Sequence, residues 1–243
     1  MTERIYTAAI LVIGNEILSG RTQDKNTNHI ANKLNECGIR LMEARTVPDI
    51  ESMIVHAVNR LRVQYDYVFT TGGIGPTHDD ITAASVAKAF ETPLEQNEEA
   101  YNILASHYTK EELTPPRLKM AQIPVGAKLV SNPVSGAPGF NIGNVYVMAG
   151  VPNIMQSMLD SILPNLKGGP VVLSKTVEAK CGESKIAEGL SKIQDKYTEI
   201  DIGSYPQYKD GVHATSIVMR CENEKMLDKA AAEVQALIES IGA

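Results

Sequence analysis

The residues best suited to chemistry form one run, Thr70-Thr-Gly-Gly-Ile-Gly-Pro-Thr-His-Asp-Asp-Ile-Thr82. Its three glycines let the backbone turn sharply and approach a ligand closely. A helix that begins after them offers unpaired N–H groups and a partial positive charge to an anion, and two threonine hydroxyls add donors. The run therefore predicts a phosphate-binding turn. Its predicted ligand-binding residues are Thr71, Gly72, Gly73, Gly75 and Thr77.

Two carboxylates, Asp79 and Asp80, stand in the same run. Carboxylates repel a neighbouring phosphate unless a cation lies between them or the carboxylates are held elsewhere. Hard divalent cations bind carboxylate and phosphate oxygens together, so a bridging Mg²⁺-like ion is one interpretation. The other is that both side chains only cap the following helix.

A second segment, Ile13-Gly-Asn-Glu-Ile-Leu-Ser-Gly20, places Glu16 at the end of an apolar run. If the first and third strands are neighbours, Glu16 faces the turn at Gly72. We therefore predict Glu16, Asp79 and Asp80 as the catalytic and metal-binding carboxylates. The alternative is a solvated loop in which Asp24 or Asn26 caps a helix.

Two further features could bind the polar parts of a ligand. The loop Ser135-Gly-Ala-Pro-Gly139 is flexible and rich in donors, and we predict Ser135, Gly136 and Gly139 as ligand-binding residues. Upstream, Arg117 and Lys119 are cations that either reach a phosphate or lie in solvent. Of these two, Lys119 is included in the predicted site.

The elements that must position these residues alternate along the chain. Residues 7–13, 39–47 and 65–71 read as strands, and apolar stripes between them read as helices. This alternation predicts an α/β fold with a mostly parallel sheet, whose ligand crevice lies at the carboxyl ends of the strands. After a linker at 164–170, the pattern strand, helix, strand, strand, helix predicts a small α+β module.

Composition narrows the classes of partner. The 243 residues carry 23 Lys and Arg against 29 Asp and Glu, a formal net charge of −6. We therefore expect no binding of nucleic acid or anionic membranes. No apolar run reaches the roughly 18 residues that span a bilayer. Three widely spaced cysteines favour a reducing cytoplasm.

The order of these motifs resembles a known family. Gly72-Gly-Ile-Gly75 with Asp80-Ile-Thr82 resembles the signature of the molybdopterin-binding (MoCF biosynthesis) family, and the longer agreement is with the CinA N-terminal domain. That resemblance implies a three-layer α/β/α domain at 1–167, followed by a KH-type module at 168–243. Because the chain stops at Ala243, we expect no C-terminal deamidase domain. The matching segments are 14–20, 24–28, 71–80, 136–139 and 150–152.

The resemblance also implies a function. Some relatives cleave the pyrophosphate of ADP-ribose or FAD with a divalent metal such as Mg²⁺, Mn²⁺ or Co²⁺. Others bind or adenylylate molybdopterin, so the implied partner is a nucleotide or pterin phosphate. The matching motif adds Asp24 and Asn28 to the expected ligand-binding residues. A homo-oligomer is expected by analogy.

Two residues depart from the family pattern. Asn15 and Ile154 stand where the family usually has Asp and Glu. Asn ligates a metal through its carbonyl but supplies no charge, and Ile does neither. A catalytically decayed nucleotide-binding module therefore remains an alternative to the enzyme.

Overall fold

The computed structural model describes residues 4–209 and 212–242. The chain forms two compact units that meet at Gly169 and Pro170. Each unit has its own buried apolar core. The first contains every residue of the predicted site.

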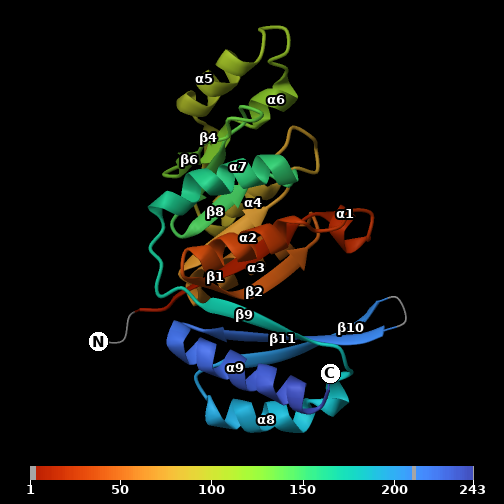
Figure 1. Cartoon of the computed structure of the whole chain (residues 1–243). Coiled ribbons are helices and arrows are strands. Elements are labelled where there is room, and N and C mark those ends of the chain that lie inside the picture. The colour runs from red at the N-terminus through yellow and green to blue at the C-terminus, as the bar shows by residue number, and fades with distance from the viewer. Residues whose placement is uncertain (1–3, 210–211, 243) are drawn as a thin grey trace. The chain divides into compact units, whose positions relative to one another are not determined.

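The first unit is built on a sheet with the strand order β2-β1-β3-β8-β7-β6. Neighbouring strands are parallel from β2 through β8, whereas β7 and β6 complete the sheet in antiparallel pairs. This arrangement confirms the predicted α/β fold with a mostly parallel sheet (Figure 1). The strands are β1 (Tyr6–Ile13), β2 (Ile39–Val47), β3 (Tyr67–Thr71), β6 (Lys128–Val130), β7 (Gly139–Ile142) and β8 (Val145–Met148).

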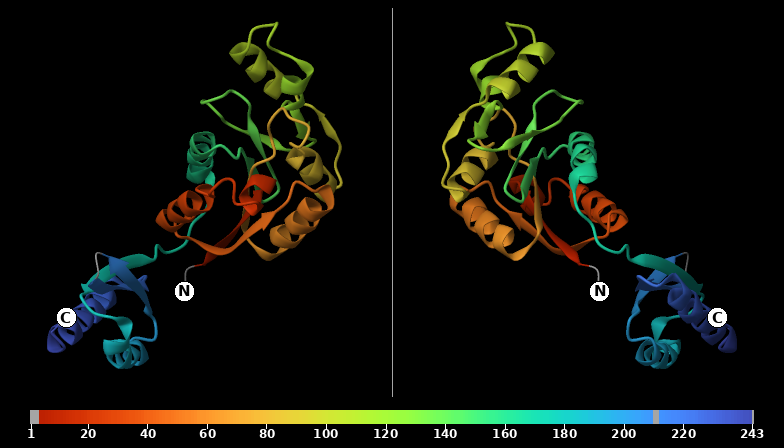
Figure 2. Two further views of the ribbon diagram at one scale, coloured as in Figure 1. Left: turned by 90° about the vertical axis from the view of Figure 1, so that its right-hand side faces the viewer. Right: turned by 90° about the vertical axis from the view of Figure 1, so that its left-hand side faces the viewer.

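Helices cover both faces of this sheet. Helices α2 (Asn26–Glu36) and α7 (Pro152–Ile162) pack on one face, and α3 (Glu51–Gln64) and α4 (Thr82–Ala89) pack on the other (Figure 2). Strand β1, which lies between β2 and β3, contributes alternate residues to the two cores, and all of them from Ala8 to Ile13 are buried. A strand buried on both faces requires a continuous apolar run, which explains the sequence of β1.

Shorter elements complete the first unit. Strand β4 pairs antiparallel with β5, and the helices α5 and α6 lie beyond this small ribbon (Figure 1). The sequence patterns did not predict β4, β5, β7 or α6, because three to five residues are too few to show a period. These elements are α1 (Asn15–Leu18), β4 (Leu94–Gln96), α5 (Glu98–His107), α6 (Pro115–Lys119), β5 (Gln122–Pro124) and the 3₁₀ turn η1 (Leu163–Asn165).

The second unit is an antiparallel sheet of order β10-β11-β9 with helices packed on its core. The order strand, helix, strand, strand, helix follows the predicted α+β pattern, whereas nothing supports the KH-type classification. No helix in the described part of the chain is long and apolar enough to cross a membrane. The elements of the second unit are β9 (Leu173–Ala179), η2 (Glu183–Lys185), α8 (Ala187–Lys196), β10 (Asp201–Lys209), β11 (Val212–Cys221) and α9 (Glu224–Ser240).

Asp66, which directly precedes β3, joins this strand to β1 at the edge opposite the predicted site. One of its carboxylate oxygens accepts hydrogen bonds from the Thr7 N–H at 2.9 Å and the Thr7 hydroxyl at 3.0 Å, and the other pairs with Arg4. Burial raises the pKa of this carboxyl, but the hydrogen bonds from Thr7 and Arg4 outweigh burial and leave the pKa below its ordinary value.

We therefore expect Asp66→Asn to lower the free energy of unfolding at pH 7 by roughly 1.5 kcal/mol, since a hydrogen-bonded charge is lost. Because the pKa of Asp66 is lower in the folded state, its carboxylate stabilises the fold fully at pH values above the unfolded-state pKa near 4. This stabilisation is lost as the pH falls through the folded-state pKa. Urea unfolding at pH 7 and pH 3 tests this expectation. A difference between the two proteins that is as large at pH 3 as at pH 7 would contradict it.

Candidate functional site

The described residues enclose a cleft of about 650 Å³ at the carboxyl edge of the parallel strands. Its floor is the glycine loop after β3, and its walls include the start of α1, the α6 helix and the loop after β8. A volume of this size suits a small-molecule ligand. From the predicted site the cleft brings together Glu16, Gly72, Gly73, Gly75, Asp80 and Ser135.

The glycines of the floor are required by close backbone contacts. A Cβ at Gly72, whose φ is +104°, would lie 2.1 Å from the Ile13 carbonyl oxygen at the end of β1. A Cβ at Gly73, with a φ of +68°, would lie 2.2 Å from the Thr82 hydroxyl. That buried hydroxyl donates to the Gly72 carbonyl at 2.9 Å. The chain therefore presents bare main chain to the cleft because strand ends leave no room for side chains.

Asp79 and Asp80 both bind Thr77. One oxygen of Asp80 accepts from the Thr77 N–H at 2.8 Å and from its hydroxyl at 2.6 Å, and Asp79 lies 2.5 Å from the same hydroxyl. The hydrogen bond from Thr77 lowers the pKa of the Asp79 carboxyl. No side chain caps α4, so the carboxylates stabilise the loop rather than the helix. Half-buried Asp80 lines the cleft, whereas exposed Asp79 and Thr77 do not.

Glu16 reaches the cleft because Gly14 leaves space for it. A Cβ at Gly14 would lie 2.6 Å from each carboxylate oxygen of Glu16. Asn15 is exposed and lies outside the cleft, and its N–H donates to Asp49 at 2.8 Å. Ile154, the other departure from the family pattern, does line the cleft.

Asp24 adopts the capping role that the sequence left open. Its Oδ1 accepts the N–H groups of Asn26 at 2.9 Å and Thr27 at 3.1 Å at the start of α2. Asp24 also lines a smaller pocket, together with Glu16 and the buried Thr71. Asn28 is exposed and accepts from Asn32, so the structure does not bring it to the cleft.

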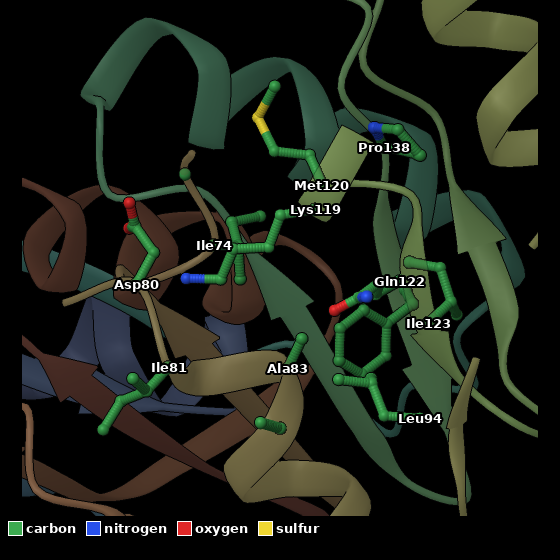
Figure 3. A pocket seen from close by; sticks show the side chains of 14 residues that line it. Ile74, Asp80, Ile81, Ala83, Leu94, Lys119, Met120, Gln122, Ile123 and Pro138 are labelled. Atoms are coloured by element: carbon green, nitrogen blue, oxygen red, sulfur yellow. The ribbon is translucent and has the colours of Figure 1, made fainter. Parts of the chain in front are cut away.

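The two cations of α6 lie at different places. Arg117 lines the cleft, with its guanidinium 4.2 Å from the centre of the Tyr108 ring and 2.9 Å from the Glu112 carbonyl. Lys119 lines an adjoining, mostly apolar pocket that shares Asp80 with the cleft (Figure 3), and its ammonium donates to the Thr77 carbonyl at 2.7 Å. Sequence spacing gave no means of choosing Arg117 over Lys119.

The loop before β7 places one predicted residue in the cleft. Buried Asn132 donates to the Ser135 hydroxyl and to the Ala137 carbonyl, each at 2.7 Å, and fixes the loop from inside. Gly136 lies against the His107 ring. Gly139 is buried in β7, where a Cβ would lie 2.3 Å from the Val147 carbonyl oxygen. Ser135 alone of the three lines the cleft.

The fold and the site together define an α/β protein whose glycine turn faces a ligand cleft at the carboxyl edge of its sheet. A family model described as "Probable molybdopterin binding domain" matches residues 9–168, and the chain belongs to this family. A second model, "FAD synthase, middle domain", matches residues 171–242.

Individual relatives agree with this assignment. A protein of Archaeoglobus fulgidus is 35% identical over 198 residues, which are 82% of this chain and 85% of that protein. A "CinA-like protein" of Citrifermentans bemidjiense is 40% identical over 66% of this chain and 40% of its own length. A "Probable FAD synthase" of Caenorhabditis elegans is 28% identical over 96% of this chain and 50% of its own length.

Among solved structures, the protein CinA of Thermoplasma acidophilum, described as having unknown function, superposes with a TM-score of 0.63 and 34% identity. The match covers 66% of this chain and 98% of that one. The resemblance to CinA that the motif order indicated is therefore confirmed.

A substitution at Gly72 tests whether the close backbone contact at the cleft floor excludes a side chain. We expect Gly72→Ala to destabilise the protein by about 3 kcal/mol or more, because it adds a backbone clash to an unfavourable φ. Gly126→Ala is the matched control, since Gly126 also has a positive φ, +86°, but nothing within 4 Å of its Cβ position. Its cost should be about 1 kcal/mol. Equal losses in urea unfolding would contradict the close approach of β1 to the loop.

Proposed function

We propose that the cleft binds a nucleoside diphosphate-linked compound and hydrolyses its pyrophosphate. The observation that carries this proposal is that bare main chain, one cation and two carboxylates share a single cleft: Gly72 to Gly75, Arg117, Glu16 and Asp80. A phosphate anhydride needs donors for its oxygens and a group that handles water, and these residues supply both.

The phosphate oxygens are expected at the glycine loop. Its main chain can be approached closely because the glycines have no side chains. Arg117 adds a guanidinium whose fork of N–H donors suits phosphate, and the Tyr108 ring stabilises its position. Both features stabilise the negative charge that develops on phosphate oxygens in the transition state.

The carboxylates of the cleft fit a divalent cation only when a ligand shares it. The described residues contain no group of three acidic, histidine or cysteine side chains that could hold a metal by themselves. Mg²⁺, however, is commonly bound by one or two carboxylates together with substrate phosphates. Glu16 and Asp80 would hold such an ion, which would supply charge stabilisation at the pyrophosphate.

The same carboxylates can orient the attacking water. In hydrolysis, water oxygen bonds to phosphorus, the bridging P–O bond breaks, and a carboxylate accepts the proton of the water. Asp80 is the better-placed base, because two hydrogen bonds from Thr77 fix its orientation. Asp79, which shares the Thr77 hydroxyl but lies outside the cleft, acts as a positioning residue.

The relatives favour FAD as the substrate over ADP-ribose. The second unit matches the FAD synthase middle domain, and the similarity to the C. elegans "Probable FAD synthase" extends over almost the whole chain. These names support a flavin dinucleotide as the compound to test first.

We expect Asp80→Asn to lower kcat for AMP release from FAD or ADP-ribose by about 100-fold or more, because a transition-state charge is lost while the contact with Thr77 is kept. Asp79→Asn should cost less than about 10-fold. Chromatographic assay of AMP with Mg²⁺, Mn²⁺ or Co²⁺ measures both. The proposal fails if the unaltered protein releases no AMP with any of these metals.

Binding or adenylylation of a pterin is the second candidate, favoured by the family's description as a probable molybdopterin binding domain. The cleft volume of about 650 Å³ admits a pterin phosphate as well as a nucleotide. ATP-dependent formation of an adenylylated pterin, without AMP release from FAD, would favour this candidate.

The hypothesis that the site has lost its catalytic activity can be tested at the position where a carboxylate of the family pattern is replaced and the side chain lines the cleft. Ile154 lines the cleft and Asn15 does not, so Ile154→Glu is the informative substitution. If the site has lost a metal ligand, Ile154→Glu should raise the metal-dependent rate by about 10-fold or more. Asn15→Asp is the control and should change the rate by less than about 2-fold. A reduced rate in Ile154→Glu would show that the apolar residue belongs to the working site.

A further inference from the structure

A small pocket of about 60 Å³ opens beside the cleft, and one of its lining residues carries an unpaired acceptor. Asn26, the first residue of α2, lines it and is only 7% exposed. Its amide nitrogen donates to the Gly150 carbonyl at 2.8 Å, which fixes the orientation of the amide. Its Oδ1 is buried and accepts no hydrogen bond within the described chain. Buried polar atoms almost always have partners, so this oxygen indicates a missing one.

Two carboxylates line the same pocket. Asp24 uses only Oδ1 to cap α2, and its second oxygen receives no hydrogen bond from the described residues. The Glu16 side chain likewise accepts none there. The lining of the pocket therefore includes three acceptor side chains without a partner in the described chain. Its other polar side chains are Thr22, Thr71, Gln23 and the exposed Lys25. Unpaired acceptors bind groups that donate hydrogen bonds.

The pocket is continuous with the cleft and close to the glycine loop. Gly72, Gly150 and Glu16 line both cavities. A group that entered the pocket would therefore lie close to Gly72 and to a phosphate at the glycine loop. In a nucleotide, the vicinal hydroxyls of the ribose are separated from the 5′ phosphate by one sugar ring.

We propose that Asn26 and Asp24, beside the Glu16 carboxylate that lines both cavities, form a subsite for the vicinal hydroxyls of a ribose whose phosphate lies at the glycine loop; this rests on the proposed function. The pocket has room for a pair of hydroxyl groups but not for a base. A cation is the poorer occupant, because the positive end of α2 lies at Asn26. Carboxylates that accept from ribose hydroxyls are a recurring way of recognising nucleotides.

The test compares ligands that differ only in these hydroxyls. Calorimetry with the full chain uses ADP, 2′-deoxy-ADP and 3′-deoxy-ADP in the presence of Mg²⁺. A lost hydrogen bond to a charged acceptor should weaken binding of a deoxy ligand by roughly 10- to 100-fold. Equal affinity for all three ligands would overturn the subsite while leaving the proposed function standing. Failure of every nucleotide to bind would overturn both.

The Asp24→Asn variant tests whether this pocket causes the preference for ADP over its deoxy analogues. Asn is as good a helix cap as Asp, so the fold is kept, but one acceptor becomes a donor. We expect the preference for ADP over 2′- or 3′-deoxy-ADP to fall to less than about 3-fold. Loss of a negative charge changes phosphate binding equally for all three ligands, so the ratio isolates the hydroxyls. Asp160→Asn, an exposed change of the same charge on α7, should keep the full preference.

Two results would contradict the assignment to Asp24. One is an undiminished preference for ADP in Asp24→Asn. The other is saturable binding of Mg²⁺ alone that Asp24→Asn abolishes, because that result would identify the pocket as a cation site.

Discussion

The close approach of strand ends beneath Gly72 determines most of the site. The Ile13 carbonyl lies where a Cβ of Gly72 would be, and the Cα of Gly72 lies 3.2 Å from the Cβ position of Gly150. Three segments that are distant in sequence therefore meet with no side chain between them. The bare main chain at the cleft floor follows from this contact, and the Thr82 hydroxyl at the start of α4 donates to the Gly72 carbonyl beside it.

A second constraint is that carboxylates stand beside a site built for an anion. Asp80 and Asp79 are held by Thr77, whose carbonyl in turn accepts from Lys119. This network keeps one carboxylate in the cleft and the other outside it. Glu16 remains without a protein partner in the described chain, so it is the carboxylate most available to a cation or a hydroxyl group.

The sequence predicted the layers and the floor of the cleft better than its walls. The apolar run of β1 and the glycines after β3 have strong patterns, and both lie where they were expected. Arg117 was one of two candidate cations between which the sequence could not choose, and Tyr108 was not predicted, because a five-residue helix has no period and the contact of Arg117 with Tyr108 joins separate elements. Gly136 and Gly139 were predicted to bind the ligand but lie outside the cleft, at close contacts with His107 and Val147. The sequence alone does not distinguish a glycine required by close packing from one that faces a ligand.

Tyr108 links two walls of the cleft. Its ring lies under the Arg117 guanidinium, and its hydroxyl donates to the Ser135 carbonyl at 3.4 Å. The buried Asn132 holds the same loop from the other side, so the cation and the Ser135 hydroxyl are positioned by one connected set of contacts. The floor is fixed by the sheet, whereas these walls are fixed by side chains. Differences in ligand preference within such a family can therefore arise at the walls while the phosphate-binding floor stays the same.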